Sequence, residues 1–157
     1  MKVLLTFGGG GHTAETMRVL KLLGPGYEYH YLILEQERHL RDKVPFPGEF
    51  HEVPQPRRRD DSSLTVALRI IPLFITMIRL LRTIRPAAII GCGPSLSVLA
   101  MWAGKLTGAR VIYVETAARV KSVSLSGRLV YPVADIFFVQ WPEMKKLLPR
   151  AEYYGRI

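Results

Sequence analysis

The side chain best suited to chemistry in this chain is His12, which follows four consecutive glycines at residues 8–11. An imidazole can take or give a proton near neutral pH, so His12 is a candidate catalytic base. The glycines permit positive φ and a close approach of the backbone to a ligand. Because a helical pattern follows, the N–H groups of Gly10, Gly11 and Thr13 can face an anion or a polarised hydroxyl. These three residues are therefore candidate binding residues.

Polar residues also follow three later apolar runs. A turn that contains Gly93 follows one run, Glu115 follows the next, and Gln140 follows the last. Right-handed crossovers bring the carboxyl ends of parallel strands to one edge of a sheet, where open α/β folds bind ligands. We therefore expect these residues to meet His12 at that edge, with Glu115 as a second candidate base. The structural alternatives are that His12 only contacts the first helix and that Glu115 pairs with Arg119.

Apolar runs and helical patterns alternate along the chain, which predicts an α/β fold built on a doubly wound parallel sheet. We expect strands at residues 3–7, 27–34, 50–53, 87–90, 110–114, 135–139 and 151–157. We expect helices at residues 13–23, 36–43, 64–84 and 95–106, one that ends near 131 and one that begins at 142. The apolar face of the first helix is expected to hold Ala14, Met17, Leu20 and Leu23, and its outer face Glu15, Arg18 and Lys21. All 157 residues are expected to form one domain.

The composition limits the partners and the kinds of site. The chain carries 22 Lys and Arg against 13 Asp and Glu, a net charge of +9, which favours nucleic acid, acidic lipid or a phosphate-bearing substrate as a partner. The single cysteine, Cys92, excludes an intrachain disulfide, and the four histidines show no ligand spacing, so no metal site is expected. The apolar run after Met1 breaks at Gly8, so we expect no signal peptide and a location on the cytoplasmic side.

Residues 64–84 are the most apolar part of the chain. Arg69, Arg79 and Arg82 interrupt this segment, and its longest uncharged window is far shorter than the ~20 residues of a membrane-spanning helix. Pro72 either kinks the helix or starts a second one. The segment either covers the sheet or rests a basic, apolar face on a membrane surface, and both can hold at once.

Two other functions fit parts of the sequence. Gly9, Gly11 and Ala14 satisfy the G-x-G-x-x-A pattern of dinucleotide-binding proteins, and Glu35 is placed to hold a ribose at the end of the second strand. A dinucleotide-binding Rossmann protein is therefore one alternative. The other is a membrane scaffold without chemistry of its own, which rests on residues 64–84 and recruits a transferase subunit.

Three sequence blocks together resemble one protein family. They are GGGGHTAET, then VIYVETAARVKSVSLSGRLVYPVADIFFVQWPEM, and a terminal YYGRI. They are similar to the membrane-recruiting subunit of the split UDP-N-acetylglucosamine transferase of lipid-linked oligosaccharide synthesis, with which bacterial polysaccharide-biosynthesis proteins of the PssD and CpsF kind belong. The resemblance covers the first strand and helix and nearly everything from Ile89 onward, and it is weak between Glu35 and Arg85.

This resemblance implies a fold and partners. Members are the acceptor-binding half of a GT-B glycosyltransferase, equivalent to the Rossmann-like amino-terminal half of the single-chain enzymes. A separate small subunit binds the UDP-sugar, carrying N-acetylglucosamine or a related sugar, so this chain is expected to bind no cofactor and to be inactive alone. The acceptor is a sugar pyrophosphoryl lipid at the cytoplasmic face of a membrane, which suits the positive charge. Nucleic acid is then not expected as a partner.

The reaction expected from the resemblance is one in-line displacement with inversion at the anomeric carbon. His12 or Glu115 takes the proton of the acceptor hydroxyl, and His12 is preferred because it projects from the glycine turn. No divalent metal is required by these residues. The further acceptor contacts, to the pyrophosphate and the sugar, are expected from Gly93, Arg119, Ser122 and Gln140.

The attachment to the membrane is expected to differ from that of the eukaryotic members, which carry an amino-terminal transmembrane helix. This sequence starts at the first strand. We therefore expect peripheral attachment through the face that carries Arg69, Arg79 and Arg82, or through another protein. The terminal YYGRI is expected to pack at the interface with the partner subunit.

Overall fold

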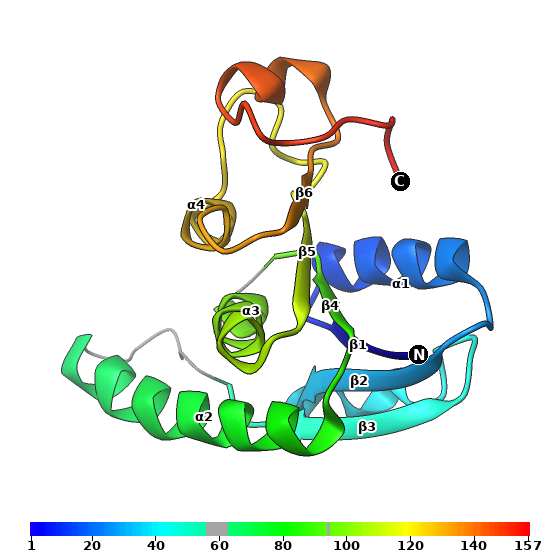
Figure 1. Cartoon of the computed structure of the whole chain (residues 1–157), viewed down its shortest axis with the longest axis vertical. Coiled ribbons are helices and arrows are strands. Elements are labelled where there is room, and N and C mark those ends of the chain that lie inside the picture. The colour runs from blue at the N-terminus through cyan, green and yellow to red at the C-terminus, as the bar shows by residue number, and fades with distance from the viewer. Residues whose placement is uncertain (56–62, 94) are drawn as a thin grey trace.

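The structure, a computed structural model, describes residues 1–55, 63–93 and 95–157, and the backbone alone for 63–67. A six-stranded parallel sheet lies at its centre, in the order β3-β2-β1-β4-β5-β6 (Figure 1). The strands are β1 (Lys2–Thr6), β2 (Glu28–Leu34), β3 (Gly48–Val53), β4 (Ala88–Gly91), β5 (Arg110–Val114) and β6 (Ile136–Phe138). The helices are α1 (Gly11–Leu23), α2 (Ser63–Ile84), α3 (Ser95–Thr107), α4 (Leu125–Val130) and two 3₁₀ segments, η1 (Glu35–Leu40) and η2 (Pro142–Lys146). The predicted α/β fold with a doubly wound parallel sheet is confirmed.

The strand order reverses at β1. This strand pairs with β2 on one side and with β4 on the other, so Thr6 stands beside both Leu32 and Gly91. The crossovers from β1 and from β3 therefore leave toward opposite faces, and α1 covers one face while α2, α3 and α4 cover the other (Figure 1). Because all five pairings are parallel, every strand ends at the same edge of the sheet.

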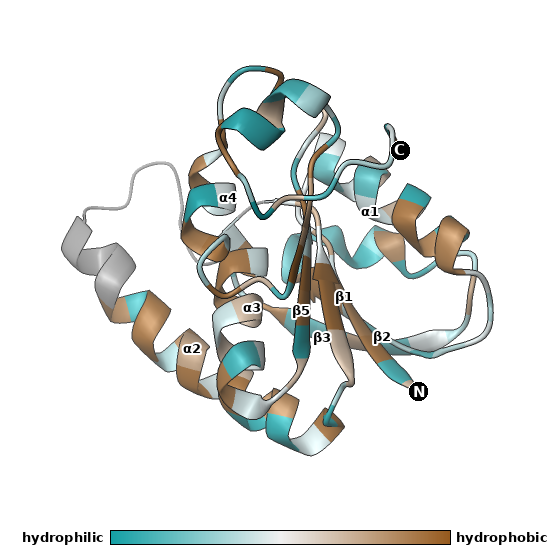
Figure 2. Cartoon of the chain, turned by 45° about the horizontal axis from the view of Figure 1, so that its top comes forward, coloured by the Kyte–Doolittle hydropathy of each residue, from teal (hydrophilic) through white to brown (hydrophobic). Residues whose placement is uncertain are grey.

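The strands contribute alternate residues to two cores. Leu4 and Leu32 pack in one core with Met77 of α2, and Leu5 packs in the other with Leu20 of α1. The inner strands β1, β4 and β5 are mostly apolar on both faces, as a parallel sheet covered by helices on both sides requires (Figure 2).

The faces of α1 differ from the expectation in one important respect. Leu20 is buried as expected, but Ala14 is exposed, whereas Glu15 and Thr16 are buried, with Glu15 only 6% exposed. The prediction that Glu15 faces solvent is therefore wrong. The first turn of α1 lies over the carboxyl edge of the sheet, where polar groups from neighbouring loops replace the water around the carboxylate.

α2 is one helix of 22 residues that continues across Pro72, rather than two helices. Its buried face is made of Leu73, Met77, Leu81 and Ile84. Its exposed face carries Leu68, Ile71 and Ile75. The expectation that this segment covers the sheet is confirmed. Within the residues that the structure describes, no helix has the length and apolar character needed to cross a membrane.

The strand expected at the end of the chain is replaced by an extended tail. Glu152 forms a single parallel bridge with Phe138, because β6 is only three residues long and offers few partners. The chain then runs along the side of the sheet that α1 also covers and ends near the helix (Figure 1).

Candidate functional site

The loops after β1 and β4 meet at the carboxyl edge of the sheet. The ring of His12 lies against the backbone of Gly93, where an added Cβ would stand 2.6 Å from both Nδ1 and Cε1 of the imidazole. Gly93 also has a φ of 61°, a conformation that favours glycine. The structure therefore brings together His12 and Gly93, two of the residues that the sequence predicted to meet.

His12 sits in the first turn of α1, just after Gly10, whose φ is 68°. Its Nδ1 is buried and lies 3.5 Å from Oε2 of Glu15, while 31% of the side chain is exposed. The exposed part of the ring is therefore the part away from Nδ1. This leaves Nε2 as the nitrogen that a substrate can reach.

Glu15 is one candidate site residue that sequence reasoning missed. Its Oε1 accepts hydrogen bonds from the Thr116 hydroxyl at 2.9 Å, from the Ala117 N–H at 2.8 Å and from Gln140 Nε2 at 3.4 Å. Burial alone would raise the pKa of Glu15, but the His12 imidazole and the hydrogen bonds outweigh burial and hold it below its ordinary value. Glu15 is thus a buried, ionised partner for His12. Its i+3 spacing from His12 was the signal available in the sequence.

Glu115 reaches the same edge, but its carboxylate is fully engaged. It is 1% exposed and accepts from the N–H of Thr116 and from both the N–H and the hydroxyl of Ser124, at 3.0 to 3.1 Å. These bonds attach the loop of residues 116–124 and the start of α4 to the end of β5. Arg119, the alternative partner of Glu115, instead donates to the hydroxyl of Ser122 at 3.5 Å, and both side chains lie on the exposed loop.

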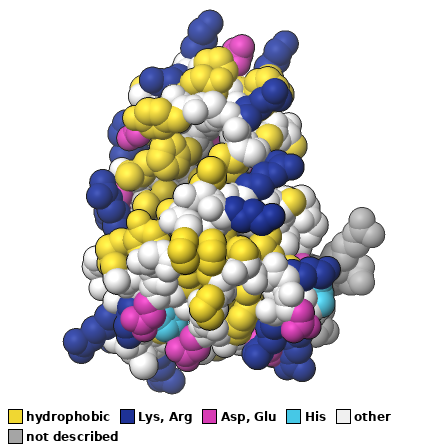
Figure 3. Space-filling view, turned by 90° about the vertical axis from the view of Figure 1, so that its right-hand side faces the viewer, with side chains coloured by type: hydrophobic (Ala, Val, Ile, Leu, Met, Phe, Trp, Pro, Cys, Tyr) yellow, Lys and Arg dark blue, Asp and Glu magenta, His cyan; other side chains and the backbone are white. Residues whose placement is uncertain are grey.

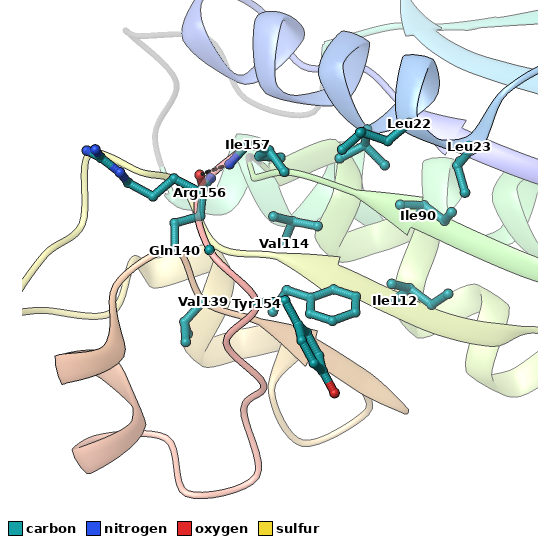
Figure 4. A pocket seen from close by; sticks show the side chains of 13 residues that line it. Leu22, Leu23, Ile90, Ile112, Val114, Val139, Gln140, Tyr154, Arg156 and Ile157 are labelled. Carbon is teal, nitrogen blue, oxygen red and sulfur yellow. Dashed lines mark hydrogen bonds between the residues drawn. The ribbon is translucent and has the colours of Figure 1, made fainter.

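Gln140 is also buried at this edge, with 3% of its surface exposed. Its Nε2 donates to the carbonyl of Glu115 at 3.1 Å as well as to Glu15, and its Oε1 accepts from the N–H of Ile157 at 3.1 Å (Figure 4). Both ends of the amide are therefore held by the protein. Gln140 connects the carboxyl-terminal tail to the carboxylate that faces His12.

A hollow of about 480 Å³ opens beside the glycine turn. Gly10 and Thr13, two of the candidate binding residues, line it together with Lys21 and Lys43. Gly11 begins α1 at its exposed end. The hollow also contains Glu37, a second residue that the sequence reasoning missed.

Glu37 is 9% exposed, and its Oε2 has no hydrogen-bond partner in the described part of the chain. Burial raises the pKa of Glu37, against the opposing effect of His39. In a hollow that Lys21 and Lys43 also line, this carboxyl can bond to a sugar hydroxyl while the lysines attract a phosphate.

A second hollow, of about 530 Å³, lies on the side of the sheet that carries α1. Figure 3 shows hydrophobic side chains gathered on this side of the molecule with Lys and Arg around them. The lining is apolar and comes from α1, from β4 to β6 and from the tail (Figure 4). The residues are Val19, Leu22, Leu23, Ile90, Ile112, Val114, Phe138, Val139, Gln140, Tyr154, Gly155, Arg156 and Ile157.

The family model for "oligosaccharide biosynthesis protein Alg14 like" matches residues 3–157. Among curated proteins, the chain is 30% identical to the UDP-N-acetylglucosamine transferase subunit ALG14 of Yarrowia lipolytica, over 98% of this chain and 80% of the relative. It is 31% identical to the rat protein of the same name, over 99% of this chain and 82% of the relative. The resemblance expected from the sequence blocks is confirmed over residues 3–157, including the segment between Glu35 and Arg85 that lacks those blocks.

Two solved structures show the same fold. MurG of Acinetobacter baumannii superposes with a TM-score of 0.74 at 17% identity, over 90% of this chain and 42% of that chain. The UDP-GlcNAc 2-epimerase of Methanocaldococcus jannaschii superposes with a TM-score of 0.75 at 12% identity, over 99% of this chain and 46% of that chain. The chain therefore spans less than half the length of each of these proteins.

The Glu15 carboxylate predicts a specific dependence of stability on pH. The folded-state pKa of Glu15 lies below the ordinary value of 4.5, so its ionised form stabilises the fold above that pH. This stabilisation is lost as the pH falls through the folded-state pKa. Glu15→Gln should lower the free energy of unfolding by about 1–3 kcal/mol at pH 7, and the difference from the wild type should shrink below about pH 4.5. Urea denaturation at a series of pH values measures this.

Glu143→Gln is the matched control, because Glu143 is exposed on η2. It should follow the wild-type curve throughout. A Glu15→Gln curve that runs parallel to the wild type across the acid range would show that the ionised carboxylate has no such role.

Proposed function

The chain belongs to the Alg14-like family of oligosaccharide biosynthesis proteins, and on this premise we propose that it is the acceptor-binding subunit of a two-component glycosyltransferase. The complex transfers N-acetylglucosamine or a related sugar from a UDP-sugar to a sugar on a lipid pyrophosphate. The observation that carries the proposal is the His12–Glu15 pair, which presents one imidazole nitrogen outward from a glycine turn at the carboxyl edge of the sheet.

His12 acts as the base in this proposal. Its Nε2 takes the proton from the acceptor hydroxyl as that oxygen attacks the anomeric carbon, and the bond to UDP breaks with its electron pair leaving on the phosphate. Attack from the side opposite to UDP inverts the anomeric centre. Ionised Glu15 holds the Nδ1 side of the ring and stabilises the imidazolium that forms, as carboxylates do beside catalytic histidines. Glu115 is not assigned the base, because its carboxylate is buried in hydrogen bonds.

The acceptor is assigned to the hollow beside the glycine turn. The N–H groups of Gly10 and Gly11 and the ammonium groups of the lining lysines favour the pyrophosphate, and Glu37 favours a sugar hydroxyl. The N–H of Thr13 donates to the carbonyl of Gly10 at 3.2 Å, so Thr13 is not assigned a backbone contact with the acceptor. Arg119 and Ser122 are exposed on the loop after β5 and remain proposed pyrophosphate contacts. Gln140 is not assigned a contact with the acceptor, because both ends of its amide are hydrogen-bonded within the protein. It supports Glu15 instead.

Replacing His12 should remove the chemistry and keep the complex. We expect His12→Ala and His12→Asn to lower the transfer rate of the reconstituted two-subunit enzyme by about 10²–10⁴-fold, the usual contribution of general base catalysis. Transfer of radiolabelled sugar to a lipid pyrophosphate acceptor measures the rate, and co-purification of the partner is the control. Wild-type turnover by either variant would instead favour the non-catalytic scaffold.

The apolar hollow on the α1 side is the proposed docking site of the UDP-sugar-binding subunit, which also supplies the donor site. The hollow holds about 530 Å³, is lined mostly by apolar side chains and is bounded by the tail. Side chains of a partner would fill it on binding and bury its apolar lining. Tyr154 is 82% exposed at its border and stacks edge-on against Phe138, with ring centroids 6.0 Å apart. The interface role expected for the terminal YYGRI is therefore part of this proposal.

A charge placed at this hollow should release the partner. Leu22 lines it and is 74% exposed, so Leu22→Glu should fold normally and weaken partner binding by about tenfold or more, because the carboxylate would lose its water in the interface. Leu106→Glu is the matched control, since Leu106 is 65% exposed on α3 at the opposite face. Equal partner affinity of the two variants, measured by titration calorimetry, would rule out this docking site.

The exposed face of α2 is the proposed contact with the membrane at its cytoplasmic side. Leu68, Ile71 and Ile75 lie one turn apart, and Arg79 and Arg82 continue the same stripe. Arg69 is half-buried and contributes less surface. Apolar side chains followed by arginines suit insertion at the headgroup level of an anionic bilayer, with the acceptor lipid delivered along it.

Charge reversal on this stripe should weaken membrane binding. The double variant Arg79→Glu, Arg82→Glu should bind phosphatidylglycerol-containing vesicles about tenfold or more weakly, at roughly 1 kcal/mol for each basic residue lost. Lys145→Glu, Lys146→Glu makes the same change of charge on η2 and is the control. If the fraction of protein that sediments with vesicles falls equally for both double variants, the attraction depends on net charge alone. That result would exclude a membrane-facing α2.

A further inference from the structure

Two histidines and a glutamate meet on the outer strands of the sheet, away from the edge that carries His12. In the register of β2 and β3, His30 stands beside Glu49 and Leu32 stands beside His51. Residues two apart on a strand share a face, so His30, Glu49 and His51 project on the same side of the sheet. The two histidines are 21 positions apart in sequence, which is why their spacing gave no sign of a site.

The distances between the three side chains match a metal site. His30 Nδ1 lies 3.1 Å from His51 Nε2 and 3.5 Å from Glu49 Oε2, and His51 Nε2 lies 4.0 Å from Glu49 Oε1. All three ligand atoms fall within 4.8 Å of one another. Tetrahedral zinc with bonds of about 2.0–2.1 Å needs its ligand atoms roughly 3.3–3.4 Å apart. Small side-chain rotations therefore suffice to close the site.

The other nitrogen of His30 faces a carboxylate, the kind of group that commonly orients metal-binding histidines. His30 is 4% exposed, and its buried Nε2 makes no hydrogen bond in the described part of the chain but faces Glu28 Oε1 at 3.6 Å. A carboxylate there keeps the proton on Nε2 and leaves the Nδ1 lone pair directed at His51 and Glu49. Glu28 in turn lies 3.5 Å from Lys2 Nζ, which holds it in place.

One proton cannot bond to all three facing atoms of this cluster at the same time. The pair of imidazole nitrogens can share one hydrogen, and the Glu49 carboxylate beside them then lacks a donor from either ring. A divalent cation bonds to both nitrogens and the carboxylate at once. We propose that His30, Glu49 and His51 form a binding site for a borderline divalent cation, with Zn²⁺ as the best fit and water in the fourth position.

The ligand types select this class of ion. Two imidazoles and one carboxylate suit zinc and its neighbours in the first transition series, whereas calcium and magnesium prefer oxygen ligands alone. Glu49 has 67% of its side chain exposed, so water can reach the open position. Because the ligands come from both β2 and β3, the bound cation would fasten the edge strand β3 to its neighbour.

The test is a titration of the metal-free full chain with ZnCl₂. We expect one Zn²⁺ per chain by calorimetry and a rise in Tm on binding. Glu49→Gln should weaken binding by about tenfold or more and His51→Gln by about a hundredfold, while Glu28→Gln should weaken it by about tenfold through His30. His39→Gln and Glu143→Gln change exposed residues elsewhere and should bind as the wild type does.

The nitrogens involved can be identified directly. Imidazole ¹⁵N spectra should show zinc-dependent shifts at Nδ1 of His30 and Nε2 of His51, and smaller changes at the other ring nitrogens. If His51→Gln fails to fold, Glu49→Gln decides, because its side chain is exposed. Absence of one-to-one binding to the wild type, or wild-type affinity in Glu49→Gln, overturns the proposal.

Discussion

The edge of the sheet depends on the buried carboxylate of Glu15. A charge so deep in a protein is costly unless hydrogen-bond donors surround it. Here the donors come from the loop after β5 and from Gln140 after β6, and the imidazole of His12 faces the second oxygen. The loops after three different strands must therefore close around one carboxylate. This arrangement fixes the carboxylate 3.5 Å from Nδ1 of His12.

The same network extends to the tail. Gln140 donates to Glu15 with one end of its amide and accepts from the N–H of Ile157 with the other. The tail also borders the apolar hollow that we assign to the partner subunit. In the proposed complex, the surface that receives the partner and the carboxylate that orients the base are thus separated by one amide side chain.

Much of the fold could be predicted because its signals are local. Apolar runs broken by glycine, proline or charge located all six strands of the sheet and the helices between them, and parallel connections implied the shared edge where His12, Gly93, Glu115 and Gln140 meet. The two errors have different causes. Glu15 was placed outward because helical periodicity counts a carboxylate as polar surface, yet donors distant in sequence bury it. The tail was read as a strand because the length of β6 is not visible in the sequence.

The roles of individual site residues were harder to predict than their location. Glu115 and Gln140 reach the expected edge, but the atoms that occupy their hydrogen-bonding groups, such as those of Ser124 and Ile157, belong to loops whose course the sequence does not reveal. Glu37 gave no signal, since a glutamate in a charged segment is normally solvated. The pairing of His30 with His51 depends on the register of two parallel strands, which hydrophobic patterning alone did not determine.

The most direct test of the central claim is the tautomer of His12, read from imidazole ¹⁵N–¹H correlations of the isolated chain at neutral pH. If Glu15 orients the ring, neutral His12 should carry its proton on Nδ1 and leave Nε2 unprotonated, and this preference should disappear in Glu15→Gln. A proton found on Nε2 in the wild type, or a tautomer unaffected by Glu15→Gln, would contradict the account.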